Sequence, residues 1–534
     1  MASSPVPLVI QPTFNWAGND GNWSTFQINV GTPPQSFDVF PSATGGEAWV
    51  ISPDFCTRFA FEGCAASRGV QLINGSQSAG FQSNASDTWD GVGIYGLTTA
   101  QNLFGAVNGS YGLDSVSLGD STSDALSGQL VAQVANESFW LGSLPLGAQS
   151  SEFDVERANV PSLLSSLKTA NRTPSLSYGY SAGAYYHSAA GGLVLGGYDA
   201  AAFEPNNLSF SIDMNTSWPL TVNLRSMIAT RSLVGTQAMP LGDSGLEMSI
   251  DSSVAQMWLP ATVCDQLADI FGLAYDAETG LYLVNSTMHS QLINLNPEVT
   301  LTLATTSGSS DTVDIVLPYA AFDQQAGPPI YSNETMYFPI RRAADESQFV
   351  LGRTVLQEAY LIVDWERQNF TVAQSTHQNG VSSGNIVPIQ PPEPESSSSG
   401  LWAGATAGIV VGVVVGLAVV LAGIWFLWWR KRRSQRKVNE MPVVEHYQPE
   451  KDDLAGAATS ELPSEERKEM PGDDSRTEVD GVSSNKGHHE LLSPMDTPQL
   501  MSSPVYEMEG DTGRQELDGT LADRDKARLY THGM

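Results

Sequence analysis

Short runs of β-branched and aromatic residues alternate with turn-forming Gly, Asn, Ser and Asp over the first 375 residues. Runs of this length, bounded by turn residues, predict the strands of a mostly β domain. Short helices are also expected at 160–168 and 261–271. The predicted strands are 26–30, 115–118, 192–195, 220–224, 299–303, 312–317 and 360–364.

The hydropathy pattern changes after residue 400. Residues 401–429 contain no charged side chain, and a helix of this length more than spans a hydrocarbon core of ~30 Å. Trp425, Trp428 and Trp429 lie at its end, and a basic cluster at 430–437 follows. Because basic residues stay on the cytoplasmic side, we expect a single-pass transmembrane helix with the N-terminal domain outside the cell.

The segments on either side of this span are polar. Residues 376–400 are rich in Pro and Ser and predict an extended stalk, while 430–534 predict a disordered cytoplasmic tail whose partner the sequence does not name. Within the span, four glycines recur at every fourth position, which either lets two helices associate closely or arises by chance in a Gly/Ala/Val-rich segment. They are Gly404, Gly408, Gly412 and Gly416.

Acceptor motifs for N-glycosylation support an ectodomain outside the cell. All eleven Asn-x-Ser/Thr motifs precede the predicted span, as expected of a glycosylated domain. Residues 1–13 form a predicted N-terminal extension without the basic and apolar regions of a signal peptide, so we expect a signal sequence upstream of Met1. The motifs begin at Asn22, Asn74, Asn84, Asn108, Asn136, Asn171, Asn207, Asn215, Asn285, Asn333 and Asn369.

Charge and cysteine content exclude several classes of function. Residues 1–400 carry 36 acidic and 11 basic side chains, which disfavours nucleic acid as a partner. The three cysteines lie in no His or Cys cluster, so we expect no metal site. No Gly-rich phosphate loop is present, and we expect no cofactor. Cys264 falls in an apolar helical stretch and predicts a buried, inert thiol.

A long internal repeat is the strongest candidate for a functional site. Ser42 and Asp251 each precede a tryptophan by seven residues, at Trp49 and Trp258. An apolar-apolar-Gly triplet follows Ser42 by 100 residues (140–142) and Asp251 by 101 (350–352). The repeat predicts two related lobes in which Ser42 and Asp251 are equivalent positions across a pseudo-twofold axis.

Several motifs resemble those of pepsin-like aspartic proteases. Gly31-Thr32-Pro33-Pro34-Gln35 with Phe37 resembles the opening strand of that family, and 111–116, 193–199 and 349–364 match further motifs in the same order. The resemblance implies a bilobal pepsin-like acid protease fold with an N-lobe at 14–200 and a C-lobe at 201–375. It also implies a small disulfide between Cys56 and Cys64. With the membrane anchor, the whole resembles membrane-anchored pepsin-like proteins of filamentous fungi, which implies plasma membrane or cell wall.

The catalytic motifs depart from the family pattern. Where the family has Asp-Thr-Gly twice, this chain has Ser42-Ala43-Thr44 and Asp251-Ser252-Ser253. In the family two carboxyls share one proton, whereas the pKa of a serine hydroxyl is too high for either role. The glycine of the family motif, which permits close backbone approach, is replaced by Thr44 in the first loop and by Ser253 in the second. Asp38 lies four residues before Ser42, too far along the strand to substitute.

These observations leave three hypotheses for function. The first is a protease-like surface receptor or sensor that binds an extended peptide or a cell-wall component between the loops at Ser42 and Asp251 without cutting it. The second is a working membrane-anchored aspartic endopeptidase that uses Asp251. The third is a structural or adhesive glycoprotein with an unused cleft.

Pepsin-like enzymes close a tyrosine-bearing hairpin, the flap, over the substrate. Tyr95 is either the aromatic residue of such a flap or an ordinary strand tyrosine.

Overall fold

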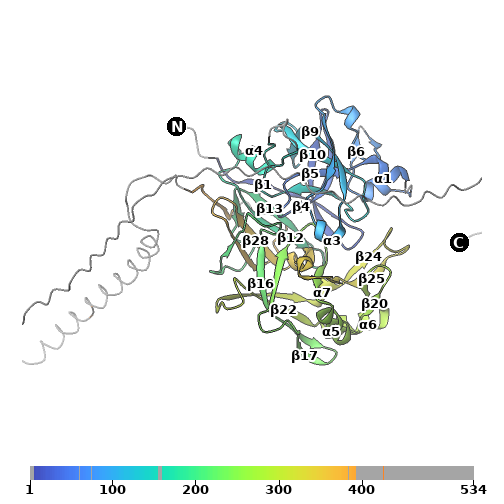
Figure 1. Ribbon diagram of the computed structural model, residues 1–534, viewed down its shortest axis with the longest axis vertical. Coiled ribbons are helices and arrows are strands. Elements are labelled where there is room, and N and C mark those ends of the chain that lie inside the picture. Colours follow the sequence, from blue (N-terminus) through green and yellow to red (C-terminus); the bar gives the residue numbers. More distant parts are fainter. Residues whose placement is uncertain are drawn as a thin grey trace, which may run out of the picture. The chain divides into compact units, whose positions relative to one another are not determined.

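The computed structural model describes residues 5–58, 61–73, 75–153, 159–382, 384–392 and Trp425. The chain divides into two units, residues 1–403 and 404–534, and every described residue except Trp425 belongs to the first. That unit has an N-lobe and a C-lobe that lie one above the other in Figure 1. The expected mostly β, bilobal fold is therefore confirmed.

The N-lobe is built on an eight-stranded sheet, which pairs parallel and antiparallel strands around β11. A two-stranded hairpin of β6 (Leu72–Ile73) and β7 (Ser76–Gln77) lies beside it. In sheet order the eight strands are β2 (Pro12–Ala17), β3 (Trp23–Val30), β4 (Gln35–Ser42), β11 (Gly142–Pro145), β5 (Ala48–Ile51), β10 (Leu126–Val134), β9 (Asn108–Leu118) and β8 (Asp90–Gly96).

The C-lobe repeats this plan with a second eight-stranded sheet and a smaller four-stranded one. The first contains β23 (Thr312–Pro318), β22 (Glu298–Ala304), β16 (Thr221–Ser232), β18 (Leu246–Ile250), β27 (Val350–Leu351), β19 (Met257–Leu259), β26 (Ile340–Arg342) and β17 (Gly235–Ala238). The second contains β20 (Ala274–Asp276), β21 (Leu281–Leu283), β25 (Thr335–Phe338) and β24 (Gln324–Ala326).

A six-stranded sheet joins the two lobes, because its strands come from both halves of the chain. All residues of β12 and β13 are buried. Most of them are Gly, Ala, Ser or aliphatic, and β12 also carries Tyr178 and Tyr180. In sheet order the strands are β1 (Leu8–Ile10), β13 (Ala189–Leu195), β12 (Ser177–Ala184), β28 (Ala359–Asp364), β29 (Asn369–Gln374) and β15 (Phe210–Ser211).

The helices are short. Predicted helix 261–271 is α5, whose buried residues fall on one face and which ends at Gly272 with a φ of 66°, a conformation that glycine adopts easily. Predicted helix 160–168 begins later, at Leu163, because Ser162 caps it. The helices are α1 (Pro53–Arg58), α2 (Cys64–Ser67), α3 (Gln101–Phe104), α4 (Leu163–Thr169), α5 (Ala261–Phe271), α6 (Ser286–Leu295), α7 (Tyr319–Phe322) and α8 (Arg353–Leu356), with 3₁₀ turns η1 (Ser83–Ala85), η2 (Tyr185–His187) and η3 (Glu346–Gln348).

The cysteines lie in two different settings. Cys56 of α1 and Cys64 of α2 form a disulfide bond. Cys264 is fully buried on α5, and burial raises the pKa of its thiol to about 12. At neutral pH this thiol is protonated and therefore unreactive.

Two predicted boundaries were wrong, because polar flanks hide short strands. Residues 8–10 belong to no loose extension: β1 pairs with β13 at the edge of the six-stranded sheet. The predicted stalk from residue 376 also starts too early, because β30 (Ile386–Pro388) pairs with β14 (Gly197–Asp199). In the first place a few apolar residues add a strand to the edge of the six-stranded sheet, and in the second they form a separate two-stranded sheet with β14.

Among the described residues, none of the helices is both long and apolar enough to cross a membrane. The predicted span 401–429 lies outside the described residues, apart from Trp425. The four glycines 404, 408, 412 and 416, the predicted tail and most of the Ser-rich part of the stalk lie outside them as well.

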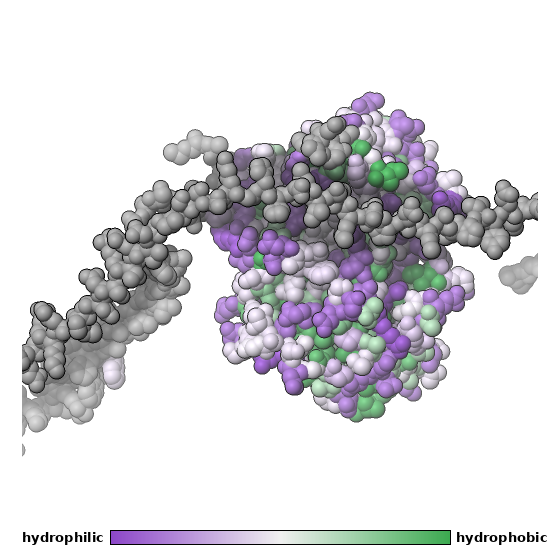
Figure 2. Space-filling view, viewed as in Figure 1, coloured by the Kyte–Doolittle hydropathy of each residue, from purple (hydrophilic) through white to green (hydrophobic). Residues whose placement is uncertain are grey.

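The face of the molecule seen in Figure 2 has both polar and apolar residues. In Figure 2 hydrophobic residues form small patches separated by hydrophilic ones. Of the predicted glycosylation sites, Asn74 lies outside the described residues, and Asn136 and Asn369 are half-buried. The others are exposed, namely Asn22, Asn84, Asn108, Asn171, Asn207, Asn215, Asn285 and Asn333.

Candidate functional site

The strand register of the N-lobe defines the position of Ser42. Ser143 of β11 lies opposite Phe40 of β4 on one side and opposite Trp49 of β5 on the other. The first pairing is parallel and the second is antiparallel. Ser42 follows Phe40 by two residues and is the last residue of β4, where the chain turns into the loop that leads to Trp49.

The C-lobe repeats this register around Asp251. Val350 of β27 lies opposite Ser249 in a parallel pairing and opposite Trp258 in an antiparallel one. Asp251 follows Ser249 by two residues, as Ser42 follows its own paired residue. The two loops therefore follow strands that are paired in the same way, and Ser42 and Asp251 occupy equivalent positions relative to these strands.

The register corrects one landmark of the sequence repeat. The N-lobe equivalent of 350–352 is 143–145, because Ser143 takes the place of Val350. The apolar-apolar-Gly triplet at 140–142 lies three residues too early. Trp140 packs instead on Phe55, so its apolar character reflects a separate cluster beside the sheet.

A serine hydroxyl joins the two loops. Ser252 Oγ donates to the carbonyl oxygen of Pro41 at 2.7 Å and accepts from the backbone N–H of Ala43 at 2.8 Å. All three residues are buried. The equivalent position in the N-lobe is Ala43. Because Ala43 has no hydroxyl, its side chain makes no corresponding hydrogen bond to the loop of the C-lobe.

The Ser42 hydroxyl faces its own loop. The side chain is 1% exposed, and its Oγ accepts from the backbone N–H of Gly45 at 3.2 Å. A Cβ at position 45 would lie 2.6 Å from that oxygen, so the absence of a side chain at Gly45 makes room for this contact. The loop closes around the hydroxyl.

Asp251 is the acid that the C-lobe presents. Its side chain is half-buried, and its Oδ1 accepts from the backbone N–H of Ser253 at 2.8 Å. Burial raises the pKa of this carboxyl, against the hydrogen bonds from Ser253 and the positive charge of Arg353. Burial is the largest of these effects, so the carboxyl holds its proton to higher pH than a free aspartic acid.

A buried arginine lies behind this loop. Arg353 is 4% exposed, donates from Nη1 to the carbonyl oxygen of Ser252 at 2.9 Å and lies 3.7 Å from the carboxylate of Asp20. Its guanidinium also lies over the rings of Phe40 and Trp23. Arg353 therefore holds the Asp251 loop in place from the side away from the cleft.

A cleft of about 820 Å³ lies between the lobes in front of Asp251. Among the described residues that line it, Asp251 is included and Ser42 is not. Three of them are acidic, and no lysine or arginine is among them. Lining side chains with acidic, aromatic or apolar character are Glu47, Glu152, Asp251, Tyr95, Tyr111, Phe153, Met214, Trp218 and Trp365.

The comparison with known families decides the identity of this two-lobed domain. The family described as eukaryotic aspartyl protease matches residues 25–375, well over half of the chain. The chain belongs to the eukaryotic aspartyl protease family. A search of the curated proteins finds no match to it.

The aspartyl protease reaction needs two carboxyls close enough to share one proton. At the two equivalent positions this aspartyl protease domain has one acid, Asp251, and one alcohol, Ser42. Asp38 does not replace the missing acid, because its buried carboxylate accepts from Asn15 Nδ2 at 3.2 Å and from Gln71. Burial raises the pKa of Asp38.

Glu47 is a buried acid of this aspartyl protease domain that the sequence did not single out. It is 3% exposed and accepts from the Thr98 backbone N–H and hydroxyl, both at 3.1 Å, and from the Tyr111 hydroxyl at 2.9 Å. These bonds tie the loop after Ser42 to the hairpin of β8 and β9. Its position two residues before Trp49 was the only sequence clue.

The β8–β9 hairpin of the aspartyl protease domain reaches across to the C-lobe. At its tip, Asn102 donates to the Ser347 carbonyl and accepts from Gln348, both at 2.5 Å. The ring of Phe104 packs edge-on against Phe139 of the N-lobe and Trp258 of the C-lobe. Helix α3 is thus wedged between the lobes, while its first residues line the cleft.

Tyr95 is the second-last residue of β8, close to the tip of this hairpin, and lines the cleft. Its ring packs edge-on against Phe153 at 4.8 Å and against Tyr111 at 6.1 Å between centroids. The residue combines the two alternatives of the sequence: it is a strand tyrosine whose ring forms part of the cleft wall.

We expect the Asp251→Asn variant to unfold at a higher temperature than the wild type at pH 7, with the difference vanishing near pH 3. The folded pKa of Asp251 is raised above the unfolded value of ~3.9. The protonated carboxyl of Asp251 therefore stabilises the folded state fully below the pKa that it has in the unfolded state. This stabilisation is lost as the pH rises through the pKa that it has in the folded state. An asparagine removes the buried charge and still accepts from Ser253.

Thermal unfolding measured from pH 3 to pH 8 checks this expectation. The Asp311→Asn variant, at an exposed position in the C-lobe, is the matched control. A variant at 251 that is less stable than the wild type at pH 7 would show that Arg353, not burial, dominates the environment of this carboxyl.

Proposed function

We propose that this chain is a single-pass cell-surface glycoprotein whose aspartyl protease domain binds an extended peptide in its cleft without cleaving it. One observation carries the proposal: the position equivalent to Asp251 is Ser42, whose hydroxyl is bound inside its own loop. A lone carboxyl cannot act as both the base that takes a proton from water and the acid that polarises the peptide carbonyl.

The cleft favours a peptide that carries basic side chains. Glu47, Glu152 and Asp251 line it, and no cationic side chain is among the described lining residues. Electrostatic complementarity selects partners of opposite charge. Tyr95 and Trp218 add aromatic surface, and the remaining wall is largely Ser, Thr, Asn and Gln, which supports backbone hydrogen bonding to an extended chain.

Placement at the cell surface rests on the uncharged segment 401–429 and on the sequons before it. The exposure of eight of these asparagines is compatible with glycan attachment in the folded domain. The plasma membrane or the cell wall is the proposed location, with the tail in the cytoplasm.

A peptidase assay tests the proposal. Full-chain protein, purified in detergent, is incubated with denatured casein from pH 3 to pH 6, with pepsin as the positive control. We expect no cleavage above background at any pH. Cleavage that pepstatin blocks and Asp251→Ala abolishes would overturn the proposal and establish an active endopeptidase.

A binding arm separates the receptor from an idle scaffold. Fluorescent Lys/Arg-rich and Asp/Glu-rich peptide pools of equal length are titrated against the same protein, and we expect binding of the basic pool only. Glu152→Gln should weaken it about fivefold, the size of a solvent-exposed ion pair of ~1 kcal/mol. Glu278→Gln, exposed and away from the cleft, should leave it unchanged. Equal or absent binding of both pools favours the structural glycoprotein.

A further inference from the structure

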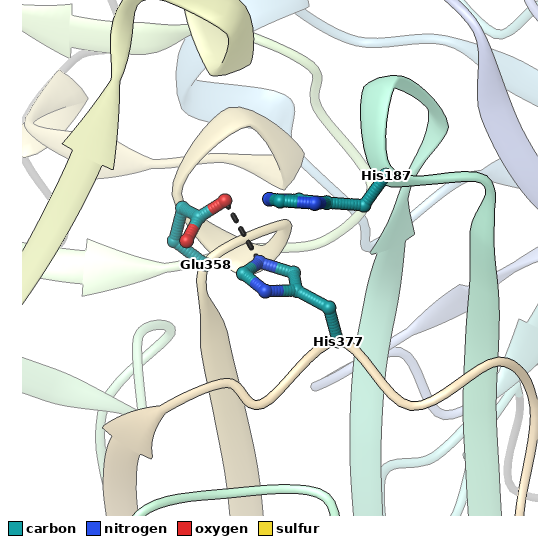
Figure 3. A group of neighbouring side chains, drawn as sticks. All are labelled: His187, Glu358 and His377. Atoms are coloured by element: carbon teal, nitrogen blue, oxygen red, sulfur yellow. Dashed lines mark hydrogen bonds and ion pairs between the residues drawn. The ribbon is translucent and has the colours of Figure 1, made fainter.

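Three potential metal ligands meet beyond one end of the inner strands of the six-stranded sheet, although they are far apart in the sequence. His187 is the last residue of η2, the turn that joins β12 to β13. Glu358 lies between α8 and β28, and His377 lies three residues after the end of β29. Figure 3 shows the two imidazole rings and the carboxylate directed toward one another.

The geometry brings one donor atom of each residue into a small volume. The three donor atoms lie within 4.8 Å of one another, and His377 Nε2 lies 3.0 Å from Glu358 Oε1. The His187 and His377 rings are stacked with centroids 4.0 Å apart. Ligands at 2.0–2.2 Å from a tetrahedral ion are about 3.4 Å apart, so the donor atoms are already near this spacing. To bind one ion, the two rings would turn out of their stacked arrangement so that a nitrogen of each points at it.

Neighbouring side chains orient the carboxylate. Glu358 is 2% exposed. Gln374 Nε2 donates to its Oε2 at 3.1 Å, and the Tyr186 hydroxyl donates to its Oε1. Hydrogen bonds of this kind around a ligand fix its orientation and strengthen metal binding. His187 is exposed, so an ion could enter from solvent and keep water as a further ligand.

We propose that His187, Glu358 and His377 bind a divalent transition-metal ion, with Zn²⁺ as the first candidate. Two imidazoles and one carboxylate form a donor set that suits zinc and its neighbours. Calcium and magnesium are excluded as preferred occupants because they require mostly oxygen ligands. The sequence predicted no metal site because 190 residues separate His187 from His377, and only the fold brings them together.

The site would act on the segment through which the chain leaves the domain. His377 has a φ of 55°, and the residues after it pack back on β13: the Gly380 N–H donates to the Ala190 carbonyl, and Asn379 Oδ1 accepts from the Ala190 N–H. An ion shared by His187, Glu358 and His377 would fasten this segment to the β12–β13 turn. None of the three ligands lines the cleft, so the site is independent of peptide binding.

Metal binding to the full chain tests this proposal. The tail pair His488 and His489 is changed to alanine in every protein tested, to remove a competing chelator. After EDTA treatment and desalting, we expect calorimetric titration with ZnCl₂ to give one ion per chain. At a hundredfold excess of Zn²⁺ over Kd, the unfolding temperature should rise by about 3 °C, and CaCl₂ should have no effect.

Single variants decide whether the named residues are the ligands. His187→Ala, at an exposed position, and Glu358→Gln, which keeps its hydrogen-bonding shape, should each weaken Zn²⁺ binding at least tenfold. His289→Ala is the matched control, because His289 forms a separate pair with Asp323. The proposal is overturned if the parent protein binds no Zn²⁺, or if His187→Ala binds it as tightly as the parent.

Discussion

The triple variant Ser42→Asp, Ala43→Thr and Thr44→Gly should cleave denatured casein at pH 3–6 at least ~10²-fold faster than the wild type. A positioned acid–base group contributes typically 10²–10⁴ in rate. When residues act as a unit, the loss of one costs about as much as the loss of all of them, so restoring the missing member restores the effect of the whole unit. Ser42 and Asp251 occupy equivalent positions in the strand pairing of the two lobes. We therefore expect an aspartate at position 42 to pair with Asp251.

Ser42→Asp needs the two accompanying substitutions, one to give the backbone freedom and one to supply a hydroxyl. The Ser42 oxygen is already 2.6 Å from the Cβ site of Gly45, so a longer side chain must leave this pocket and turn toward the cleft. Thr44→Gly frees the backbone to adjust, and Ala43→Thr supplies a hydroxyl at the position equivalent to Ser252. The single Ser42→Asp variant should therefore gain less activity than the triple variant.

Initial rates with and without pepstatin measure the gain. Adding Asp251→Ala to the triple variant is the control and should return the rate to that of the wild type. If the triple variant folds but gains no pepstatin-sensitive activity, the missing acid is not the reason for inactivity. The hairpin would then be the next candidate, because its contacts with both lobes would have to break if it moved to admit a substrate.

The Ser252→Ala variant should be destabilised by about 2–4 kcal/mol. The substitution leaves the Ala43 N–H and the Pro41 carbonyl without their hydrogen-bond partner, and each unsatisfied buried group costs ~1–3 kcal/mol. Both groups lie at the junction of the lobes, so the loss weakens the contact that aligns Ser42 with Asp251.

Urea unfolding followed by tryptophan fluorescence measures this change. Ser290→Ala is the matched control, because the Ser290 hydroxyl also donates to a backbone carbonyl, but on the exposed face of α6. If Ser252→Ala unfolds at the same urea concentration as the control, the hydroxyl of Ser252 does not contribute to the free energy of unfolding.

Strand positions and the two-lobed repeat could be predicted from the sequence, because both depend on local patterns. Trp49 and Trp258 marked equivalent strands correctly, since each pairs with the central strand of its lobe. The triplet at 140–142 was misleading because apolar residues also serve side clusters, such as Trp140 on Phe55. Pattern alone does not distinguish these two uses.

The rest of the candidate site depends on contacts between distant segments. Glu47 is an ordinary acid in the sequence until Thr98 and Tyr111 surround it. Arg353 follows a motif of apolar residues, and its role behind the Asp251 loop depends on Asp20, more than 300 residues earlier. Such long-range pairings leave no periodic trace in the chain.

The contacts of α3 with both lobes favour a cleft wall that is already formed before a ligand binds. Phe104 is held between Phe139 and Trp258, and Asn102 is bonded to Ser347 and Gln348. A ligand that required the hairpin to lift would have to break all of these contacts. The proposed peptide would instead meet a preorganised surface, which lowers the entropy cost of binding.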